Sequence, residues 1–319
     1  MSLSNNIVYF LIKIIINIII NILNLSIPST ITKINSHLLH EKEIELFIKR
    51  DDLIHEIISG NKWRKLKYNF KEASNKGLST ILSFGGAYSN HLHALSYACN
   101  KMGFDSVGVV RGDEPNILNS TLSDCKKNKM KLIFLDRLTY RKQKYHNQLL
   151  NDFRKKNGDF YLIPEGGNNI YGVRGCQEIV EEISFDFDYF CCSVGTGCTS
   201  SGIIKSLNNK CQFIGFAPFP KVTEQKNNIL KYCSPASYNN WKILPDKYFG
   251  GYSKINSNLI KFIGQFKFAH SIQLDFIYMG KLFFNLFNLI QKDYFKKKSR
   301  IVVLHSGGLQ GINGFNLSK

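Results

Sequence analysis

The chain has 319 residues, 44% of them apolar, which is enough for two domains of ordinary size, each with a buried core. Its formal charge of +18 raises nucleic acid or an anionic membrane as partners, but the lysines are dispersed and the densest basic run, residues 296–300, is short, so we expect no nucleic-acid binding. The eight cysteines form no CxxC pair and no zinc-type spacing, which predicts buried thiols in a reducing cytoplasm and no metal site.

Residues 7–25 are almost wholly apolar and are interrupted by Lys13, Asn17, Asn21 and Asn24. These four fall at spacings of 4, 4 and 3, so on a helix they line one face. A membrane span needs about 20 mainly apolar residues, and a polar stripe is unfavourable in lipid, so an amphipathic helix is at least as good an interpretation as a span. A signal peptide has less support, because no Lys or Arg precedes the apolar run. A misassigned start also stays open.

From residue 28 onward, short β-branched or aromatic runs alternate with longer segments of helical periodicity. The predicted strands are residues 44–49, 80–84, 106–111, 132–136, 160–164, 189–194, 213–217 and 301–305. The predicted helices are residues 91–102, 140–156, 173–183, 258–266 and 280–290. Such alternation predicts an α/β architecture with mostly parallel sheets.

Lys62 lies at a predicted junction between a strand and a helix. It follows the turn 60–61, and after it the apolar residues Trp63, Leu66 and Phe70 recur at helical spacing. Partial desolvation at such a junction lowers the pKa of an amine and makes it a nucleophile toward an aldehyde. The alternative is that Lys62 is one of several basic residues on a solvated helix face.

Three later turns are rich in glycine, and each directly follows an apolar run: residues 83–91, 193–202 and 305–311. Glycines in the second turn let the backbone approach an anion, and free N–H groups at a helix start bind phosphate. The turn lacks both the P-loop ending and the full GxGxxG spacing, so a tight turn without a ligand stays open. In the first turn, Ser89 and Asn90 begin a helix as N-caps, as ligand contacts, or as both.

Several motifs occur together in this chain, in the order GNKxRKL at 60–66, GGxxSN at 85–90, PEGG at 164–167, GTGxT at 195–199 and HSGG at 305–308. With this set the chain closely resembles the family of pyridoxal-phosphate enzymes that comprises D-cysteine desulfhydrase and 1-aminocyclopropane-1-carboxylate deaminase. The resemblance covers about residues 28–315.

The resemblance implies the tryptophan-synthase β-like fold, called fold type II, with two open α/β domains. Residues 28–67 and 173–319 would form a large cofactor-binding domain, and residues 68–172 a smaller domain inserted between them. Residues 1–27 are an apolar extension outside the resemblance. The family also implies a homodimer in the cytoplasm, with membrane contact through residues 7–25 left open.

The resemblance assigns pyridoxal 5'-phosphate as the cofactor. Lys62 matches the lysine that holds the cofactor covalently and moves protons at the substrate α-carbon. The segment matching the loop that binds the cofactor phosphate consists of Gly195, Thr196, Gly197, Cys198 and Thr199.

The resemblance also assigns the residues around the substrate. Ser89, Asn90 and His91 match the segment that receives the substrate carboxylate, with Asn90 also near the cofactor's phenolic oxygen. Tyr252 and Tyr278 match two tyrosines that abut the substrate. We therefore expect Ser89 and both tyrosines to act with the lysine in catalysis.

The choice between the family's two activities depends on Met279 and Ser306. In the deaminases, the residue after the second tyrosine is a glutamate that keeps the pyridine nitrogen protonated; here it is Met279. In the desulfhydrases, the nitrogen meets a hydroxyl residue just before the C-terminal Gly-Gly pair; here it is Ser306, which also binds the cofactor. A neutral partner makes a milder electron sink, which suffices to expel a thiolate whose thiol has a pKa of about 8.5.

We therefore predict a lyase that converts D-cysteine, or a related small D-amino acid, to pyruvate, sulfide and ammonia. Two alternatives stay open. The first is 1-aminocyclopropane-1-carboxylate deaminase activity, which gives 2-oxobutanoate and ammonia. The second is a catalytically inactive membrane-surface protein on the same fold, which the apolar N-terminus and the charge of +18 suggest.

Overall fold

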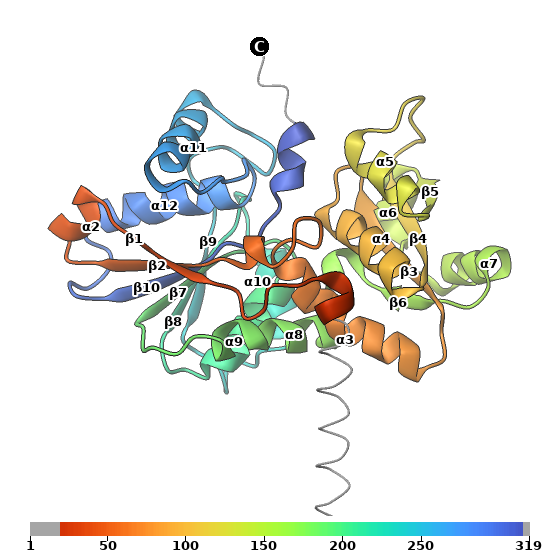
Figure 1. Ribbon diagram of the computed structural model, residues 1–319, viewed down its shortest axis with the longest axis horizontal. Coiled ribbons are helices and arrows are strands. Elements are labelled where there is room, and N and C mark those ends of the chain that lie inside the picture. The colour runs from red at the N-terminus through yellow and green to blue at the C-terminus, as the bar shows by residue number, and fades with distance from the viewer. Residues whose placement is uncertain (1–19, 315–319) are drawn as a thin grey trace, which may run out of the picture.

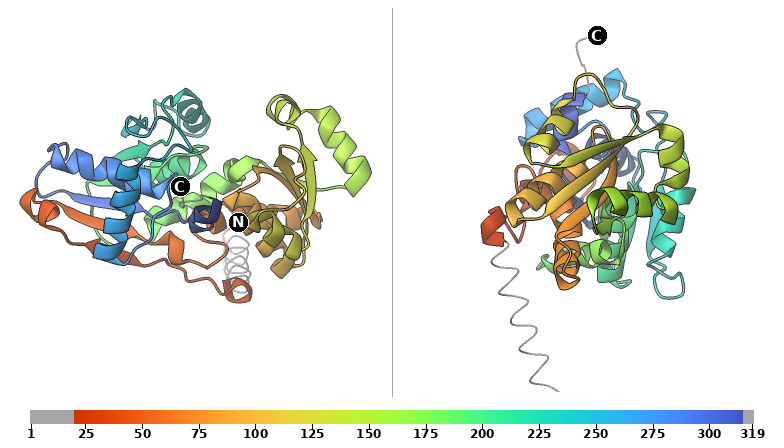
Figure 2. Two further views of the ribbon diagram at one scale, coloured as in Figure 1. Left: turned by 90° about the horizontal axis from the view of Figure 1, so that it is seen from above. Right: turned by 90° about the vertical axis from the view of Figure 1, so that its right-hand side faces the viewer.

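The computed structural model describes residues 20–314, which form two lobes, each built on one sheet (Figures 1 and 2). The six-stranded sheet has the order β1 (Ile31–Ile34), β2 (Glu45–Lys49), β10 (Arg300–Leu304), β7 (Tyr189–Ser193), β8 (Gln212–Phe216), β9 (Trp241–Leu244). The four-stranded sheet has the order β5 (Lys131–Leu135), β4 (Asp105–Arg111), β3 (Thr80–Gly86), β6 (Tyr161–Ile163). All neighbouring strands pair in parallel except β1 with β2.

Helices cover both faces of each sheet, as Figure 1 shows. In the large lobe they are α2 (His37–Glu41), α8 (Ile170–Glu181), α9 (Cys198–Leu207), α10 (Thr223–Leu230), α11 (Ser257–His270) and α12 (Met279–Gln291). Those of the small lobe and the junction are α3 (Asn61–Asn75), α4 (Asn90–Met102), α5 (Ser120–Lys127), α6 (Arg137–Gln143) and α7 (Asn147–Asn157). Short 3-10 helices are η1 (Asp51–Leu53), η2 (Glu165–Gly167) and η3 (Leu309–Gly314).

The cores lie between these layers. On one face of the large sheet, side chains of α11 and α12 pack against β2 and β10; on the other face, those of α8 and α9 pack against β7 and β10. In the small lobe, α3, α4 and α5 share one core, while α6 and α7 contribute to the core on the opposite face of the sheet. Consecutive apolar residues of one strand, such as Ile301 and Val302, therefore pack into the cores on opposite faces of the sheet.

The α/β architecture and all eight predicted strands are confirmed, with ends shifted by at most a few residues. Sequence analysis missed β1 and β9, which have only four residues each and too little apolar periodicity to be recognised. The prediction of one helix over residues 140–156 is wrong, because the chain leaves the helix between α6 and α7. There Tyr145 turns its hydroxyl to accept the Glu165 N–H at 2.8 Å.

The predicted domain boundaries at 67/68 and 172/173 remain a proposal, supported by the strands on either side of them joining different sheets. Of the apolar N-terminal segment, residues 7–19 lie outside the described residues. Leu23 and Leu25 are buried against α3 and α4, and Ser26 N–H donates to the Ile54 carbonyl at 2.9 Å. Between residues 20 and 314, no helix combines the length and the apolar character needed to cross a bilayer.

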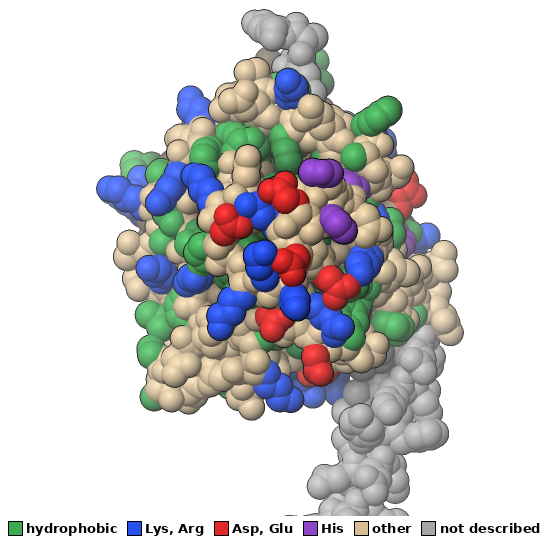
Figure 3. Space-filling view, turned by 90° about the vertical axis from the view of Figure 1, so that its left-hand side faces the viewer, with side chains coloured by type: hydrophobic (Ala, Val, Ile, Leu, Met, Phe, Trp, Pro, Cys, Tyr) green, Lys and Arg blue, Asp and Glu red, His purple; other side chains and the backbone are tan. Residues whose placement is uncertain are grey.

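Charges of both signs are interspersed on the face of the large lobe that Figure 3 shows. Ion pairs on β1, β2, β10, α2 and the nearby turns join Lys33 to Glu45, Arg300 to Glu45, Lys297 to Glu43 and Lys42 to Asp293. The excess of basic residues therefore does not form a patch of one sign on this face.

A buried group of charges joins α3 to the large lobe. The Arg64 guanidinium donates to both oxygens of Asp51, at 3.2 and 3.1 Å, and to both oxygens of Glu182. Lys49 Nζ donates to Glu182 at 2.6 Å and to the Ser29 carbonyl at 2.7 Å. Burial alone would lower the pKa of Arg64, but the two carboxylates outweigh it and raise that pKa. Each charge depends on the others being present.

Removing Glu182 should therefore destabilise the protein strongly. Glu182→Ala leaves Arg64 and Lys49 in the interior with one carboxylate fewer, and we expect the free energy of unfolding to fall by about 3 to 5 kcal/mol. Chemical denaturation followed by circular dichroism measures this. The matched control Glu43→Ala breaks the exposed pair with Lys297 and should leave the free energy of unfolding nearly unchanged. Equal losses in the two variants would contradict the importance of the buried group.

Candidate active site

Lys62 is the second residue of α3, and its backbone is fixed by the turn that follows β10. Gly60, which precedes the helix with φ of +68°, lies so close to this turn that a Cβ there would be 1.8 Å from the Ser306 carbonyl oxygen. The next residue, Asn61, donates its N–H to the same carbonyl at 3.3 Å. The GNK and HSGG motifs, far apart in sequence, are thus in direct contact.

The Lys62 amine is linked to the predicted phosphate loop through Asn61. Its Nζ donates to Asn61 Oδ1 at 2.7 Å, and Asn61 Nδ2 donates to Thr199 Oγ1 at 3.0 Å. Burial lowers the pKa of Lys62 to about 7, and the positive charge of Lys65 contributes further in the same direction. An amine with this pKa is neutral, and therefore nucleophilic, in a large fraction of molecules near neutral pH.

The predicted phosphate loop connects β7 to α9. Gly197 precedes the helix in the left-handed region, with φ of +92°, and no side chain caps the first turn. The first N–H groups of a helix have no partner within the helix. Among residues 20–314, Thr196 Oγ1 and Ser200 Oγ are buried without a hydrogen-bond partner. These donors, at the positive end of a helix dipole, fit a phosphate group.

The structure places Ser89, Asn90 and His91 at the start of α4, in the small lobe. Ser89 caps α4 by accepting the Leu92 N–H at 3.2 Å, which confirms its interpretation as an N-cap. Asn90 accepts from Gln310 Nε2 at 2.6 Å, and its amide nitrogen lies 3.2 Å from where a Cβ of Gly308 would be.

His91 is buried, and its Nε2 lies 3.0 Å from Ser83 Oγ. Burial lowers the pKa of His91 to about 3, with contributions from Lys65 and Lys62, so its ring is neutral at physiological pH. The His91 ring therefore packs at the junction as a neutral group close to the lysines.

Tyr252 and Tyr278 face one another. The Tyr278 hydroxyl donates to the Tyr252 hydroxyl at 3.2 Å, with ring centroids 5.7 Å apart, and Tyr252 stacks on Phe219. A Cβ at Gly195 would lie 3.3 Å from the Tyr278 hydroxyl, so this pair adjoins the predicted phosphate loop. Burial raises the pKa of both tyrosines, which keeps their hydroxyl protons in place near neutral pH.

Met279 and Ser306, the two residues on which the predicted choice of activity depends, are in contact. Ser306 donates its N–H to Met279 Sδ at 3.4 Å, and its Oγ lies 3.9 Å from the same sulfur. The nearby carboxylate of Asp275 accepts the N–H groups of Ile277, Tyr278 and Met279 at 2.8 to 2.9 Å. Its oxygens therefore hold the start of α12, and the Met279 and Ser306 side chains lie together as a neutral pair.

Sequence analysis did not single out four residues that the structure places at this junction. Asn61 bridges Lys62 to the phosphate loop, and Lys65 Nζ donates to the Gly166 carbonyl at 3.0 Å. Gln310 binds Asn90 and also accepts from Thr121 Oγ1 at 2.8 Å. Asn61, Lys65 and Gln310 lie inside or next to the recognised motifs, so their place in the sequence could have indicated a role in the site. Thr121 lies outside these motifs, and nothing in the sequence indicated it.

Comparison with known proteins agrees with this arrangement. Residues 30–307 match the profile of the family described as pyridoxal-phosphate dependent enzyme. The chain is 30% identical over 285 residues to a protein of Pyrococcus furiosus provisionally named a 1-aminocyclopropane-1-carboxylate deaminase, covering 84% of this chain and 85% of that protein. It is 27% identical to the mitochondrial bifunctional D-cysteine desulfhydrase/1-aminocyclopropane-1-carboxylate deaminase of Arabidopsis thaliana, covering 84% of this chain and 73% of that protein.

A crystal structure described as that of a 1-aminocyclopropane-1-carboxylate deaminase homologue is similar in fold. The TM-score is 0.76 at 26% identity, and the match covers 92% of this chain and 95% of the other. The predicted fold type II architecture is therefore confirmed, as is pyridoxal phosphate as the cofactor of the family.

The lowered pKa of Lys62 gives a test that does not depend on turnover. Protein freed of cofactor should attach pyridoxal phosphate covalently at a rate that rises as the pH increases through about 7 and then levels off, because the amine is by then neutral. An amine with the ordinary pKa of 10.5 would gain rate well beyond pH 9. Borohydride reduction at timed intervals and mass spectrometry of the peptide containing Lys62 measure the rate.

The rate for free butylamine, divided by the neutral fraction of that amine at each pH, corrects for ionisation of the cofactor itself. A corrected rate that still climbs above pH 9 would contradict the lowered pKa.

Proposed function

The chain belongs to the pyridoxal-phosphate-dependent enzyme family, and from this premise we propose that it catalyses β-elimination of D-cysteine, or of a related small D-amino acid, to pyruvate, sulfide and ammonia. The observation that carries the proposal is the neutral pair Met279 and Ser306 beside the start of α3, where Lys62 has a lowered pKa.

We assign the steps to residues as follows. When bound, pyridoxal phosphate supplies an electron sink for the charge that develops at the substrate α-carbon. The phosphate would lie against the start of α9, where Thr196 and Ser200 offer unpaired hydroxyls. Lys62 Nζ would hold the cofactor until the substrate amine displaces it, and would then remove the α-proton.

The substrate would lie between α4 and the tyrosine pair. Its carboxylate would approach Ser89 and Asn90 at the N-terminal end of α4, where helix N–H groups favour an anion. Tyr252 and Tyr278, both protonated near neutral pH, would adjoin the β-carbon and its leaving group. A hydroxyl there can donate to the departing sulfur and stabilise its negative charge.

The neutral pair favours elimination over opening of a cyclopropane ring. A thioether and a hydroxyl cannot hold a positive charge on the ring nitrogen as a carboxylate can, so the sink is mild. Loss of a proton from the α-carbon and of a thiolate from the β-carbon needs less stabilisation than breaking a carbon–carbon bond in a substrate that has no α-hydrogen. The Arabidopsis relative carries both activities in its name, which makes the deaminase reaction the second candidate.

We also propose that the protein is a homodimer located in the cytoplasm, by similarity to its family. Sedimentation of the purified protein tests the first part, and cell fractionation the second. The alternative of an inactive protein at a membrane surface has less support, because Lys62, the phosphate loop and the tyrosine pair are all assembled.

Lys62→Ala should lower turnover of D-cysteine by at least about a thousandfold, because the variant loses both the covalent attachment point and the proton-transfer group. The phosphate cradle is untouched, so the cofactor should still associate without a covalent bond. Pyruvate formation and the protein mass after borohydride reduction give the two readouts. The control Lys71→Ala, in the same helix, should behave like the unaltered protein. Substantial turnover in Lys62→Ala would overturn the assignment.

The substrate choice is tested by comparing kcat/KM for D-cysteine with kcat/KM for 1-aminocyclopropane-1-carboxylate. We expect the first to be larger in the unaltered protein. Met279→Glu, which introduces at the first residue of α12 the glutamate that the resemblance assigns to the deaminases, should shift the ratio toward the cyclopropane by about tenfold or more. Met279→Gln, whose new side chain has the shape of glutamate without its charge, should not shift the ratio. A larger value for the cyclopropane in the unaltered protein would favour the second candidate.

A further inference from the structure

Lys281 is a buried lysine one helical turn after Tyr278 on α12. Its Nζ donates to the Gly251 carbonyl and, at 3.2 Å, to the Tyr252 carbonyl. The ammonium group thus reaches from the helix that carries one tyrosine of the pair to the backbone of the other. These two carbonyls are backbone acceptors of the Lys281 amine, and the Asp246 carboxylate is its ion-pair partner.

Asp246 completes the arrangement at the start of the same loop. Its Oδ1 accepts the N–H groups of Tyr248 at 3.1 Å and Phe249 at 3.3 Å, while its Oδ2 lies 3.7 Å from Lys281 Nζ. The Asp246 N–H donates to the carbonyl of Phe219, the residue on which Tyr252 stacks. Both ends of the loop 246–252 are therefore tied to one buried ion pair.

A buried lysine destabilises the fold unless hydrogen bonds or an opposite charge compensate its ammonium group. Burial lowers the pKa of Lys281, which reflects the cost of keeping an ammonium group away from water, and Asp246 offsets this effect in part. An apolar side chain at this position would avoid the cost of burying a charge. What an apolar side chain could not do is donate to the two carbonyls of the loop.

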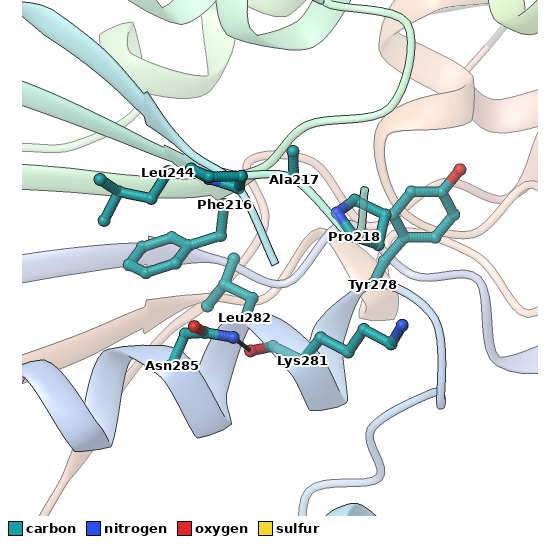
Figure 4. Close-up of a pocket in the computed structure, with 9 residues that line it drawn as sticks. Phe216, Ala217, Pro218, Leu244, Tyr278, Lys281, Leu282 and Asn285 are labelled. Carbon is teal, nitrogen blue, oxygen red and sulfur yellow. Dashed lines mark hydrogen bonds between the residues drawn. The ribbon is translucent and has the colours of Figure 1, made fainter. Parts of the chain in front are cut away.

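A shallow, tightly packed depression adjoins this lysine, and Figure 4 shows residues that line it. It lies between the ends of β8 and β9 and the first turns of α12, and its lining includes Pro218, Pro245, Tyr278, Lys281 and Asn285. Lys281→Arg keeps the positive charge and the N–H donors, so it is the conservative variant at this position.

We propose that Lys281 is a positioning residue that, with Asp246, clamps the loop carrying Tyr252 to the helix carrying Tyr278 and so sets the geometry of the tyrosine pair. This inference rests on the proposed function for the role of that pair in turnover. Lys281 itself does not touch the substrate; it acts through the Tyr252 backbone.

A double-mutant cycle tests whether Lys281 acts through Tyr252. We expect Tyr252→Phe to lower kcat for D-cysteine by about ten- to a hundredfold, and Lys281→Met to lower it by a similar factor. The double variant should lose no more than about twofold beyond Tyr252→Phe, because the clamp has nothing further to position. Lys281→Arg should recover most of the kcat lost in Lys281→Met. Losses that multiply in the double variant would overturn the proposal.

A second readout does not involve turnover. Amide hydrogen exchange in the cofactor-bound protein should become faster over residues 247–254 in Lys281→Met and remain unchanged in β2 and β7. The control Lys297→Met, which removes an exposed lysine paired with Glu43, should change neither exchange nor kcat. Unchanged exchange over the loop would overturn the clamp.

The two readouts separate this inference from the proposed function. Faster exchange over the loop in Lys281→Met, in a protein that does not turn over D-cysteine, would support the clamp and contradict D-cysteine as the substrate. Turnover of D-cysteine with unchanged exchange keeps the substrate and rejects the clamp. If Lys281→Met does not fold, Asp246→Asn removes the charged partner and leaves the lysine in place. This variant should speed up exchange over the same residues, but by a smaller factor. Unchanged exchange in Asp246→Asn would count against the clamp.

Discussion

The site depends on a close backbone contact between the start of α3 and the turn after β10. Gly60 leaves no room for a side chain beside the Ser306 carbonyl, and Asn61 donates to that same carbonyl. Lys62 follows directly, so its position is set by the parallel pairing of β2 with β10, which brings the two segments to one edge of the sheet. The lysine is thus held by the turn after β10 and by the segment that precedes it, in which the Gly60 N–H donates to the Asp51 carbonyl at 2.8 Å.

The buried charges around Arg64 fix the same helix two residues later. Asp51 lies between β2 and α3, and Glu182 directly follows α8, so the guanidinium holds α3 against both. Because α8 packs between α3 and α9, this contact also sets the distance from Lys62 to the proposed phosphate loop at the start of α9. The charges that stabilise the fold therefore also determine where the amine lies relative to that loop.

The assembly of the site could be expected from the sequence, since turns that follow parallel strands meet at the carboxyl edge of a sheet. The motifs after β7 and β10 lie at the carboxyl edge of the large sheet, and the motif after β3, which belongs to the other sheet, contacts the segment after β10 through the hydrogen bond of Gln310 to Asn90. What could not be expected depends on contacts between distant residues. The break between α6 and α7 follows from the hydrogen bond of Tyr145 to Glu165, and the task of Lys281 follows from two carbonyls of a loop that precedes it by some thirty residues.

The N-terminal segment is amphipathic, as its polar stripe predicts, but buried apolar side chains of its described part contact the protein itself. Asn21 and Asn24 are exposed, whereas Leu23 and Leu25 are buried, as the polar stripe predicts for an amphipathic segment. The apolar side chains pack against α3 and α4, and Ser26 is bonded to the backbone at Ile54. Burial within the protein accounts for Leu23 and Leu25, whereas Ile22, between Asn21 and Leu23, is 54% exposed.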